Sequence, residues 1–246
     1  MAGRIDMAAL SSNAPQTRLQ ATEQELSEFT YIVSHDLAAT FRHVRAFSDL
    51  LRQEGGFTPQ QDNYCRQVQT AADKCAAMME QLLIYSRVMR QPLKPEDCAL
   101  DTLLDTVRLR LGEEIRRSGA QFEIGPLGRA RVDPDLFVQA LHQLVGNAIK
   151  FRREGIAPRL RFAVDGTRLS LTDNGIGLGD LDPERLFGMF YRGHAEGTYA
   201  GCGAGLTIAR RILRRHGGEV RFLAPPDGAA GACVEIELPR DGERQE

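Results

Sequence analysis

The chain has 246 residues, enough for one large domain or two small ones with a core each. Its formal net charge of −2 gives no general attraction to nucleic acid or anionic lipid, so we expect neither as a partner. Short basic clusters such as Arg210-Arg211 are expected to be solvated helix faces.

The five cysteines are odd in number and lack CxxC spacing, which argues against a zinc site or a disulfide framework. No stretch approaches the roughly 18 apolar residues of a membrane span, and no secretion signal is present. A cytoplasmic protein without membrane insertion is therefore predicted.

Helical periodicity begins at Arg18, after residues 1–17, which show no pattern and are predicted to be disordered. Apolar or small residues then recur at the spacing of a helix stripe or coiled-coil seam. They are Leu19, Leu26, Phe29, Val33, Leu37, Thr40, Val44, Phe47 and Leu51. The Gly55-Gly56 pair and Pro59 predict a break after this helix.

A second helix has a more regular seam, in which steps of four and three residues alternate. Its members are Tyr64, Val68, Ala71, Cys75, Met78, Leu82, Tyr85 and Met89. Two such helices joined by a short break predict an all-α antiparallel hairpin over residues 18–92. Because one hairpin cannot cover two apolar stripes, we expect two chains to form a dimeric four-helix bundle, a homodimer. A hairpin packed on its own C-terminal domain is the alternative.

After Pro95 the pattern changes, and helices alternate with short strands. Helices are predicted over residues 100–118, 135–152 and about 205–215. Strands are predicted over residues 121–124, 159–164, 168–172, 219–223 and 232–238, with a tight turn at Asp165-Gly166. Mainly antiparallel strands mixed with helices predict an α+β domain over residues 93–240, followed by a loose tail over 241–246.

A polar stripe on the first helix contains His35. Steps of seven residues from it reach Glu28, Arg42 and Asp49, so its imidazole should face solvent. Asp36 follows directly, and a carboxylate beside an imidazole can accept the Nδ1 proton and leave Nε2 as a nucleophile. By itself this pattern is weak, because a single histidine on a helix is usually an ordinary surface residue.

The segment around His35 resembles the phosphoacceptor segment of two-component sensor histidine kinases, in particular the phytochrome-like branch. It runs Phe29-Thr30-Tyr31-Ile32-Val33-Ser34-His35-Asp36-Leu37. The resemblance implies that His35 is phosphorylated and that Asp36 assists it. Thr40 stands where the family usually has proline, so the helix should be straighter. Ala39 replaces a polar residue that commonly positions water, so phosphatase activity toward a partner regulator should be weak.

Three further segments resemble, in order and spacing, the ATP-binding domain that this family shares with type II topoisomerases and Hsp90-type chaperones, the GHKL or Bergerat fold. Residues 141–151 resemble its asparagine box. A helix there places the Asn147 amide and the Lys150 ammonium about one turn apart, and amide oxygens suit Mg²⁺. The resemblance implies that Asn147 binds Mg²⁺ and that Lys150 and Phe151 contact ATP. Gln143, one turn earlier, is a second candidate ligand for the metal.

The second segment, residues 173–178, has the pattern Asp-x-Gly-x-Gly after a predicted strand. In isolation it could be any turn. The resemblance implies that Asp173 accepts a hydrogen bond from the adenine amino group. Gly175 and Gly177 would let the backbone pass close to the nucleotide.

The third segment opens a helix with closely spaced glycines, which present free N–H groups to phosphate. By resemblance its ATP-binding residues are Gly201, Gly203, Gly205 and Leu206. A lone glycine pattern could also indicate a dinucleotide fold, but no strand-then-acidic pattern supports this here. Residues 186–192 resemble the family's phenylalanine box. Arg192 at its end is either a phosphate contact or a solvated charge, and residues 193–200 should form a mobile lid.

Together the four segments cover residues 18–239 and predict an ATP-dependent protein-histidine autokinase. It would phosphorylate His35 and pass the phosphoryl group to an aspartate of a response regulator receiver domain. The alternative is a catalytically weak phosphotransfer or docking scaffold, a pseudokinase. The residues before the first helix are too few for a sensory domain. We therefore expect a signal from a separate sensory protein in trans, or through the N-terminal extension of the helix.

Overall fold

The computed structural model describes residues 13–194, 199, 201–226 and 230–238, with side chains in the first helix described from Glu28 onward except Phe29. The chain divides into two compact units, residues 1–91 and 92–246. The predicted disorder of residues 1–12 and the predicted loose tail, 241–246, lie outside the described residues. Among the described residues, no helix is long and apolar enough to cross a membrane.

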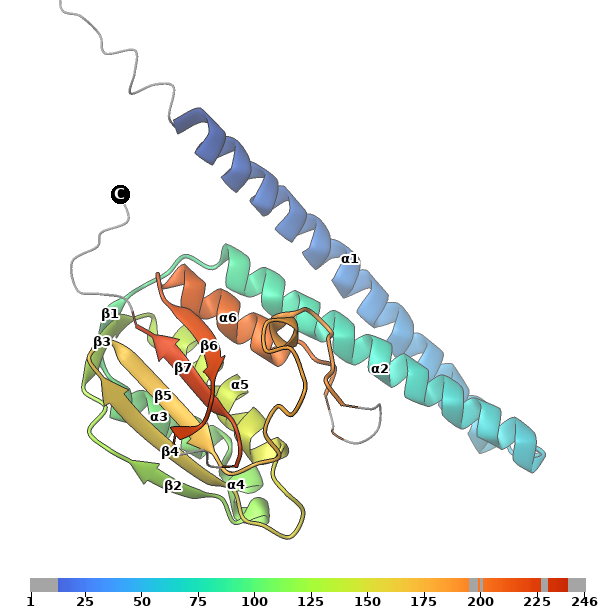
Figure 1. Ribbon diagram of the computed structural model, residues 1–246. Coiled ribbons are helices and arrows are strands. Elements are labelled where there is room, and N and C mark those ends of the chain that lie inside the picture. The colour runs from blue at the N-terminus through green and yellow to red at the C-terminus, as the bar shows by residue number, and fades with distance from the viewer. Residues whose placement is uncertain (1–12, 195–198, 200, 227–229, 239–246) are drawn as a thin grey trace, which may run out of the picture. The chain divides into compact units, whose positions relative to one another are not determined.

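The first unit is a hairpin of two long helices, α1 (Asn13–Glu54) and α2 (Pro59–Arg90), as predicted (Figure 1). Helix α1 begins at Asn13, five residues before the predicted start. Pro15 is compatible with this start, because a proline in the first turn of a helix costs no hydrogen bond. The break between the helices uses Gly55 and Gly56, which both have left-handed φ values. Thr58 then caps α2 in a reciprocal capping box with Gln61.

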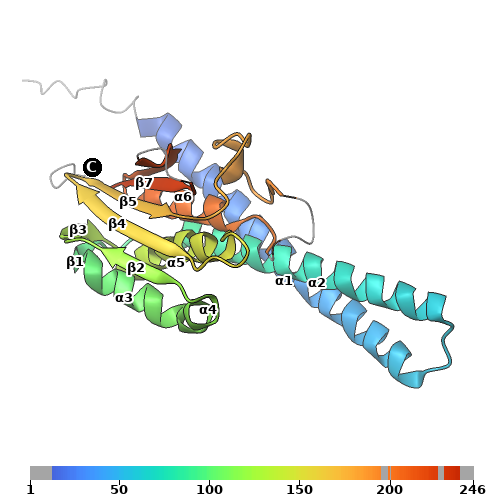
Figure 2. The same cartoon turned by 60° about the horizontal axis from the view of Figure 1, so that its bottom comes forward.

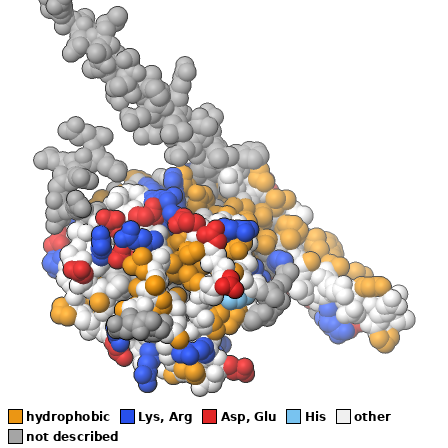
Figure 3. Space-filling view, viewed as in Figure 1, with side chains coloured by type: hydrophobic (Ala, Val, Ile, Leu, Met, Phe, Trp, Pro, Cys, Tyr) orange, Lys and Arg blue, Asp and Glu red, His pale blue; other side chains and the backbone are white. Residues whose placement is uncertain are grey.

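Small side chains are buried in the middle of the hairpin, including Ala38, Ser48 and Ala72. The Ser48 hydroxyl donates to the Cys65 carbonyl at 3.2 Å, which brings α1 close to α2. Large apolar side chains on the same helices stay exposed, and they include most of the predicted seam of α1. They are Tyr31, Ile32, Val33, Leu37, Val44, Phe47, Leu50, Leu51, Tyr64 and Val68. Figure 3 shows hydrophobic side chains gathered along the visible face of the hairpin. The predicted seam is therefore not the surface that joins α1 to α2.

The second unit is built on a five-stranded sheet with the order β2-β4-β5-β7-β6. Its strands are β2 (Gln121–Ile124), β4 (Arg159–Asp165), β5 (Arg168–Asp173), β7 (Cys233–Glu237) and β6 (Glu219–Leu223). Only the pairing of β2 with β4 is parallel, so the prediction of mainly antiparallel strands is confirmed. A separate two-stranded sheet, β1 (Glu96–Ala99) with β3 (Arg129–Val132), was not predicted.

Helices cover one face of the five-stranded sheet (Figures 1 and 2). They are α3 (Leu100–Arg110), α4 (Gly112–Ser118), α5 (Pro134–Lys150) and α6 (Gly205–Arg215), and a short 3₁₀ helix, η1, spans Arg185–Phe187. The single helix predicted over residues 100–118 is wrong, since Leu111 leaves helical geometry just before Gly112, a poor helix former. The core between the layers contains Phe137, Leu160, Phe162, Ile208, Ile212 and Ile236.

The start of α5 is tied to the end of α6 by two buried polar residues, Asp133 and His216. His216 Nε2 accepts the Asp133 N–H at 2.9 Å, and Nδ1 lies 2.8 Å from the Ile212 carbonyl, so Nδ1 carries the proton. The ring is thus a neutral structural link, and burial lowers its pKa. The Asp133 carboxylate caps α5 through Leu136 N–H and also accepts Lys94 N–H.

Mild acid should destabilise the second unit through His216. Because the pKa of His216 is lower in the folded chain, the unfolded chain takes up the proton first as pH falls. The stabilisation is complete above about pH 6.5 and is lost as pH falls through the folded pKa, by at most about 1.4 kcal/mol per pH unit. Urea unfolding between pH 7.5 and 5 measures this. His216→Gln should be less stable but show a shallower pH dependence, and an unchanged slope would contradict the assignment.

Candidate active site

The C-terminal end of α5 presents Asn147 and Lys150, one turn apart and both half-buried. The Lys150 ammonium lies 4.3 Å from the centre of the Phe151 ring. Burial, and then the nearby charge of Arg192, lowers the pKa of Lys150. A Cβ placed on Gly201 would lie 3.6 Å from Lys150 Nζ, so the glycine-rich turn comes close to this cation. Two neighbouring positive charges in a partly buried position favour an anion.

Asp173 ends β5 and starts a turn that docks on the end of α5. Its Oδ1 accepts the N–H groups of Gly175 at 2.7 Å and Ala232 at 3.2 Å. Burial raises the pKa of this carboxyl, and the two backbone bonds oppose the rise. Ile176 N–H donates to the Phe151 carbonyl at 3.0 Å, and a Cβ on Gly175 would lie 2.5 Å from that oxygen. Only glycine allows this close approach between the turn and α5.

The glycine-rich turn leads into the N-terminus of α6, which has no side-chain cap. A Cβ on Gly205 would lie 2.4 Å from Gln143 Oε1, and a Cβ on Gly203 would lie 2.5 Å from the Tyr191 carbonyl. Gln143 on α5 therefore faces the start of α6, where backbone N–H groups and the helix dipole favour phosphate. Leu206 follows in the first turn, half-buried. The structure thus brings together the three segments that the sequence singled out in this unit.

Aromatic side chains that the motifs do not contain complete this site. Tyr199 packs against Phe151 with ring centres 4.8 Å apart, and His194 lies 5.6 Å from Phe151 and 5.4 Å from Tyr199. Arg192 donates from Nη2 to the Tyr199 carbonyl at 2.8 Å. Of the predicted lid, residues 195–198 and 200 lie outside the described residues. No local signal could reveal this cluster, because it depends on contacts between distant segments.

A cavity of about 450 Å³ lies beside the Asp173 turn but is a different feature. Its walls come from residues 176–183, 222–225 and 230–232. Of the residues predicted to bind ATP, only Gly177 lines this cavity. We therefore do not assign it to the nucleotide.

His35 lies on α1 with 61% of its side chain exposed, as the polar stripe predicts. Its Nδ1 is 3.2 Å from Asp36 Oδ1, and the Tyr31 ring stacks on it with centres 6.4 Å apart. The Arg90 guanidinium of α2 covers Tyr31 at 4.4 Å. Thr40 Oγ1 donates at 3.0 Å to the Asp36 carbonyl, which a proline ring at this position would crowd. Helix α1 accordingly runs through this position as one element.

Residues 132–242 match the family described as histidine kinase-, DNA gyrase B- and HSP90-like ATPases. Over 236 residues, 93% of this chain, the sequence is 29% identical to cyanobacterial phytochrome A of Nostoc sp., of which it covers 30%. Over 237 residues, 89% of this chain, it is 28% identical to sensor protein GacS of Pseudomonas syringae pv. syringae, of which it covers 26%. The chain thus spans about three tenths of the length of these curated relatives.

Solved structures have the same fold. Full-length ShkA in complex with AMPPNP matches with a TM-score of 0.59 and 23% identity, over 86% of this chain and 45% of that one. The histidine kinase AdeS of Acinetobacter baumannii matches with a TM-score of 0.57 and 15% identity, over 83% of this chain and 97% of that one.

The part of the second unit that matches this family model, residues 132–242, includes the end of α5, the Asp173 turn and the glycine-rich turn. The relatives that match over most of the chain include a sensor histidine kinase and a regulatory histidine kinase, so the resemblance to two-component sensor histidine kinases is confirmed.

The Asp173 turn should depend on Gly231, which packs against it. A Cβ on Gly231 would lie 1.9 Å from the Asp173 carbonyl oxygen, and its φ of +120° suits only glycine. Gly231→Ala should lower the free energy of unfolding by about 3 kcal/mol or more, from backbone strain and displacement of β5. Gly166→Ala is the matched control, because Gly166 also has positive φ but has no neighbour within 4 Å, so about 1 kcal/mol is expected. Equal losses in urea unfolding would refute the role of the close approach.

Proposed function

We propose that this chain is an ATP-dependent histidine autokinase that phosphorylates His35 and transfers the phosphoryl group to an aspartate of a response regulator. The observation that carries the proposal is the convergence of α5, the Asp173 turn and the glycine-rich turn in one unit, in a chain that also displays an exposed His35–Asp36 pair. The proposal includes three partners of the chain. They are a second copy of the chain, a receiver domain and a separate sensory protein.

The nucleotide would be held by groups of complementary chemistry. Asp173 would accept a hydrogen bond from the adenine amino group, as carboxylates do from exocyclic amines of bases. Gly175 and Gly177 would let the backbone pass close to the base. Lys150 and Arg192 would face the phosphates, with the N–H groups of the glycine-rich turn.

The donor set at the end of α5 fits Mg²⁺. Asn147 and Gln143 supply amide oxygens one turn apart, and hard oxygen ligands suit this ion, which keeps several waters. Among the described residues, no group of three His, Cys, Asp or Glu side chains could hold a metal. When bound, the ion would neutralise charge on the phosphates.

Phosphoryl transfer would begin at His35. In the tautomer with its proton on Nδ1, Asp36 accepts that proton in a hydrogen bond, and the Nε2 lone pair attacks the γ-phosphorus. An N–P bond forms, the bond between the γ-phosphorus and the bridging oxygen breaks, and ADP leaves. The Nδ1 proton passes to Asp36 or to solvent. Since this reaction relies on positioning and electrostatics, the cations around the phosphates would contribute most of the stabilisation.

The exposed apolar stripe of the hairpin supports a homodimer. Phe47 is 67% exposed and Ile32 60%, on helices whose buried side chains are mostly small. Contiguous apolar patches of this kind usually mark interaction sites. A second hairpin would cover the stripe and complete a four-helix bundle.

Replacing the phosphoacceptor should abolish labelling. With γ-labelled ATP and Mg²⁺, His35→Ala should incorporate label only at background level, because no other group would have the required position. His43→Ala is the matched control, since His43 is also exposed on α1, and its labelling should equal that of the unmodified chain. Normal labelling of the His35 variant would exclude the proposed acceptor.

A charge in the apolar stripe should separate the dimer. Phe47→Glu would bury a carboxylate against apolar side chains, at a cost of several kcal/mol, so sedimentation should shift from two chains toward one. Leu109→Glu changes an equally apolar side chain, 83% exposed on α3, and should leave the association state unchanged. A monomeric unmodified chain, or an unaffected Phe47 variant, would argue against this interface.

A further inference from the structure

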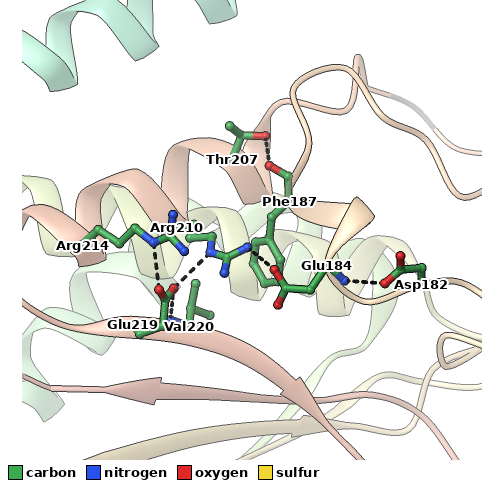
Figure 4. A network of polar contacts seen from close by, with 8 residues as sticks. All are labelled: Asp182, Glu184, Phe187, Thr207, Arg210, Arg214, Glu219 and Val220. Carbon is green, nitrogen blue, oxygen red and sulfur yellow. Dashed lines mark hydrogen bonds and ion pairs between the residues drawn. The ribbon is translucent and has the colours of Figure 1, made fainter. Parts of the chain in front are cut away.

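The segment that leads toward the lid, residues 182–191, is held on α6 by a polar network centred on Arg210 (Figure 4). Arg210 Nη1 donates to Glu184 Oε2 at 2.7 Å, and Nε donates to Glu219 Oε1 at 3.0 Å. Its guanidinium also lies 4.6 Å from the centre of the Phe187 ring. With only 17% of the side chain exposed, Arg210 is not the solvated surface charge that the sequence suggested.

The same helix also fixes the backbone of this segment. Thr207 Oγ1, one turn before Arg210, donates to the Phe187 carbonyl at 2.8 Å. The Phe187 side chain is buried, and its ring centre is 5.4 Å from that of Phe222 on β6. The backbone N–H of Glu184 donates to Asp182 Oδ1 at 3.0 Å, and this bond fixes the main chain at Glu184. The segment is therefore attached to α6 through side chain and main chain together.

A second attachment lies at the other end of the segment. Gly203, just before α6, packs so tightly on Tyr191 that a Cβ would lie 2.5 Å from the Tyr191 carbonyl. Between the two attachments, Phe190 has φ +62° and is the one non-glycine residue with positive φ among those described. This backbone costs about 1 kcal/mol or more and persists only where surrounding contacts determine it. The strain shows that the segment is fixed from both sides.

We propose that Arg210 is a positioning residue of the nucleotide site. Through Glu184 and Phe187 it fixes residues 184–191 on the helix whose N-terminus carries the glycine-rich turn. Arg192, the next residue, is thereby held in register with that turn and with Lys150, so that all three face the phosphates. This inference rests on the proposed ATP site and adds to it how the phosphate-facing arginine is placed.

The test compares two ligands of the whole 246-residue chain, Mg·ATP and adenosine, by calorimetry. Arg210→Gln should weaken Mg·ATP binding roughly three- to tenfold, as expected for loss of one coupled contact. Adenosine binding should not change, because the adenine side of the site, at Asp173, does not touch Arg210. A general loss of structure would weaken both ligands equally. The variant should fold, because Glu184 is 66% exposed and Glu219 retains its 2.8 Å bond to Arg214.

Three further variants sharpen the test. Arg214→Gln is the matched control, since it removes a bond to the same Glu219 without touching Glu184 or Phe187, and it should bind as the unmodified chain does. Arg210→Lys should retain part of the affinity, because an ammonium can keep the charge and one carboxylate partner. Glu184→Gln removes the carboxylate partner of Arg210 from an exposed position and should reproduce the loss of Mg·ATP affinity. In the double variant, Glu184→Gln should weaken binding little beyond the effect of Arg210→Gln.

Unchanged Mg·ATP binding by both Arg210→Gln and Glu184→Gln would overturn the inference, and so would equal losses for Mg·ATP and adenosine. If the unmodified chain bound no Mg·ATP, the proposed function itself would fail before Arg210 was tested.

Discussion

The candidate site depends on a single carboxylate, Asp173, whose Oδ1 accepts backbone N–H groups from Gly175 and Ala232. These two bonds join the end of β5 to its own turn and to the start of β7. Within this turn, the Ile176 N–H donates to the Phe151 carbonyl at the end of α5. Because the carboxyl is mostly buried, its hydrogen bonds are stronger than they would be in water, and the neighbouring backbone has little freedom. Asp173 and the helix with Asn147 and Lys150 therefore form one rigid arrangement.

Glycine makes this arrangement sterically feasible. Gly175 and Gly231 both stand where any side chain would overlap backbone atoms, at the Phe151 and Asp173 carbonyls respectively. The Gly175 contact gives the Asp-x-Gly-x-Gly pattern a packing role, since its first glycine permits close main-chain packing between the turn after β5 and the end of α5. Comparable crowding at Gly203 and Gly205 ties the glycine-rich turn to Tyr191 and Gln143.

Much of this organisation could be predicted from the sequence because it depends on local signals. Hydrophobic periodicity, the Gly55-Gly56 break and the Asp165-Gly166 turn located the hairpin and most strands of the sheet. The missed elements have other causes. Strands β1 and β3 are four residues long and pair across separations of 30 to 36 residues, so no turn signal links them. The alternation of Arg129–Val132 is too short to predict a strand by itself. The break at Leu111 lies in a sequence that is otherwise good for helix.

The site itself was predictable only where motifs carry it. His35, Asn147, Asp173 and the glycines were predicted from pattern, whereas Tyr199, His194 and Arg210 are placed by contacts with residues distant in sequence. Arg210 illustrates the limit, because helical spacing alone places it on a polar face. Its burial comes from Glu184 and Glu219, which lie 26 and 9 residues away. Ion pairs between residues distant in sequence produce no periodic pattern, so hydrophobic periodicity cannot predict them.

The small side chains inside the hairpin have a consequence for the apolar stripe on its outside. Ala38, Ser48 and Ala72 are almost fully buried in the hairpin, so an added methylene there should push the helix axes apart. The stripe is carried by the same two helices and would widen with them. A change in the interhelical distance would therefore alter the inner and outer surfaces of the hairpin together.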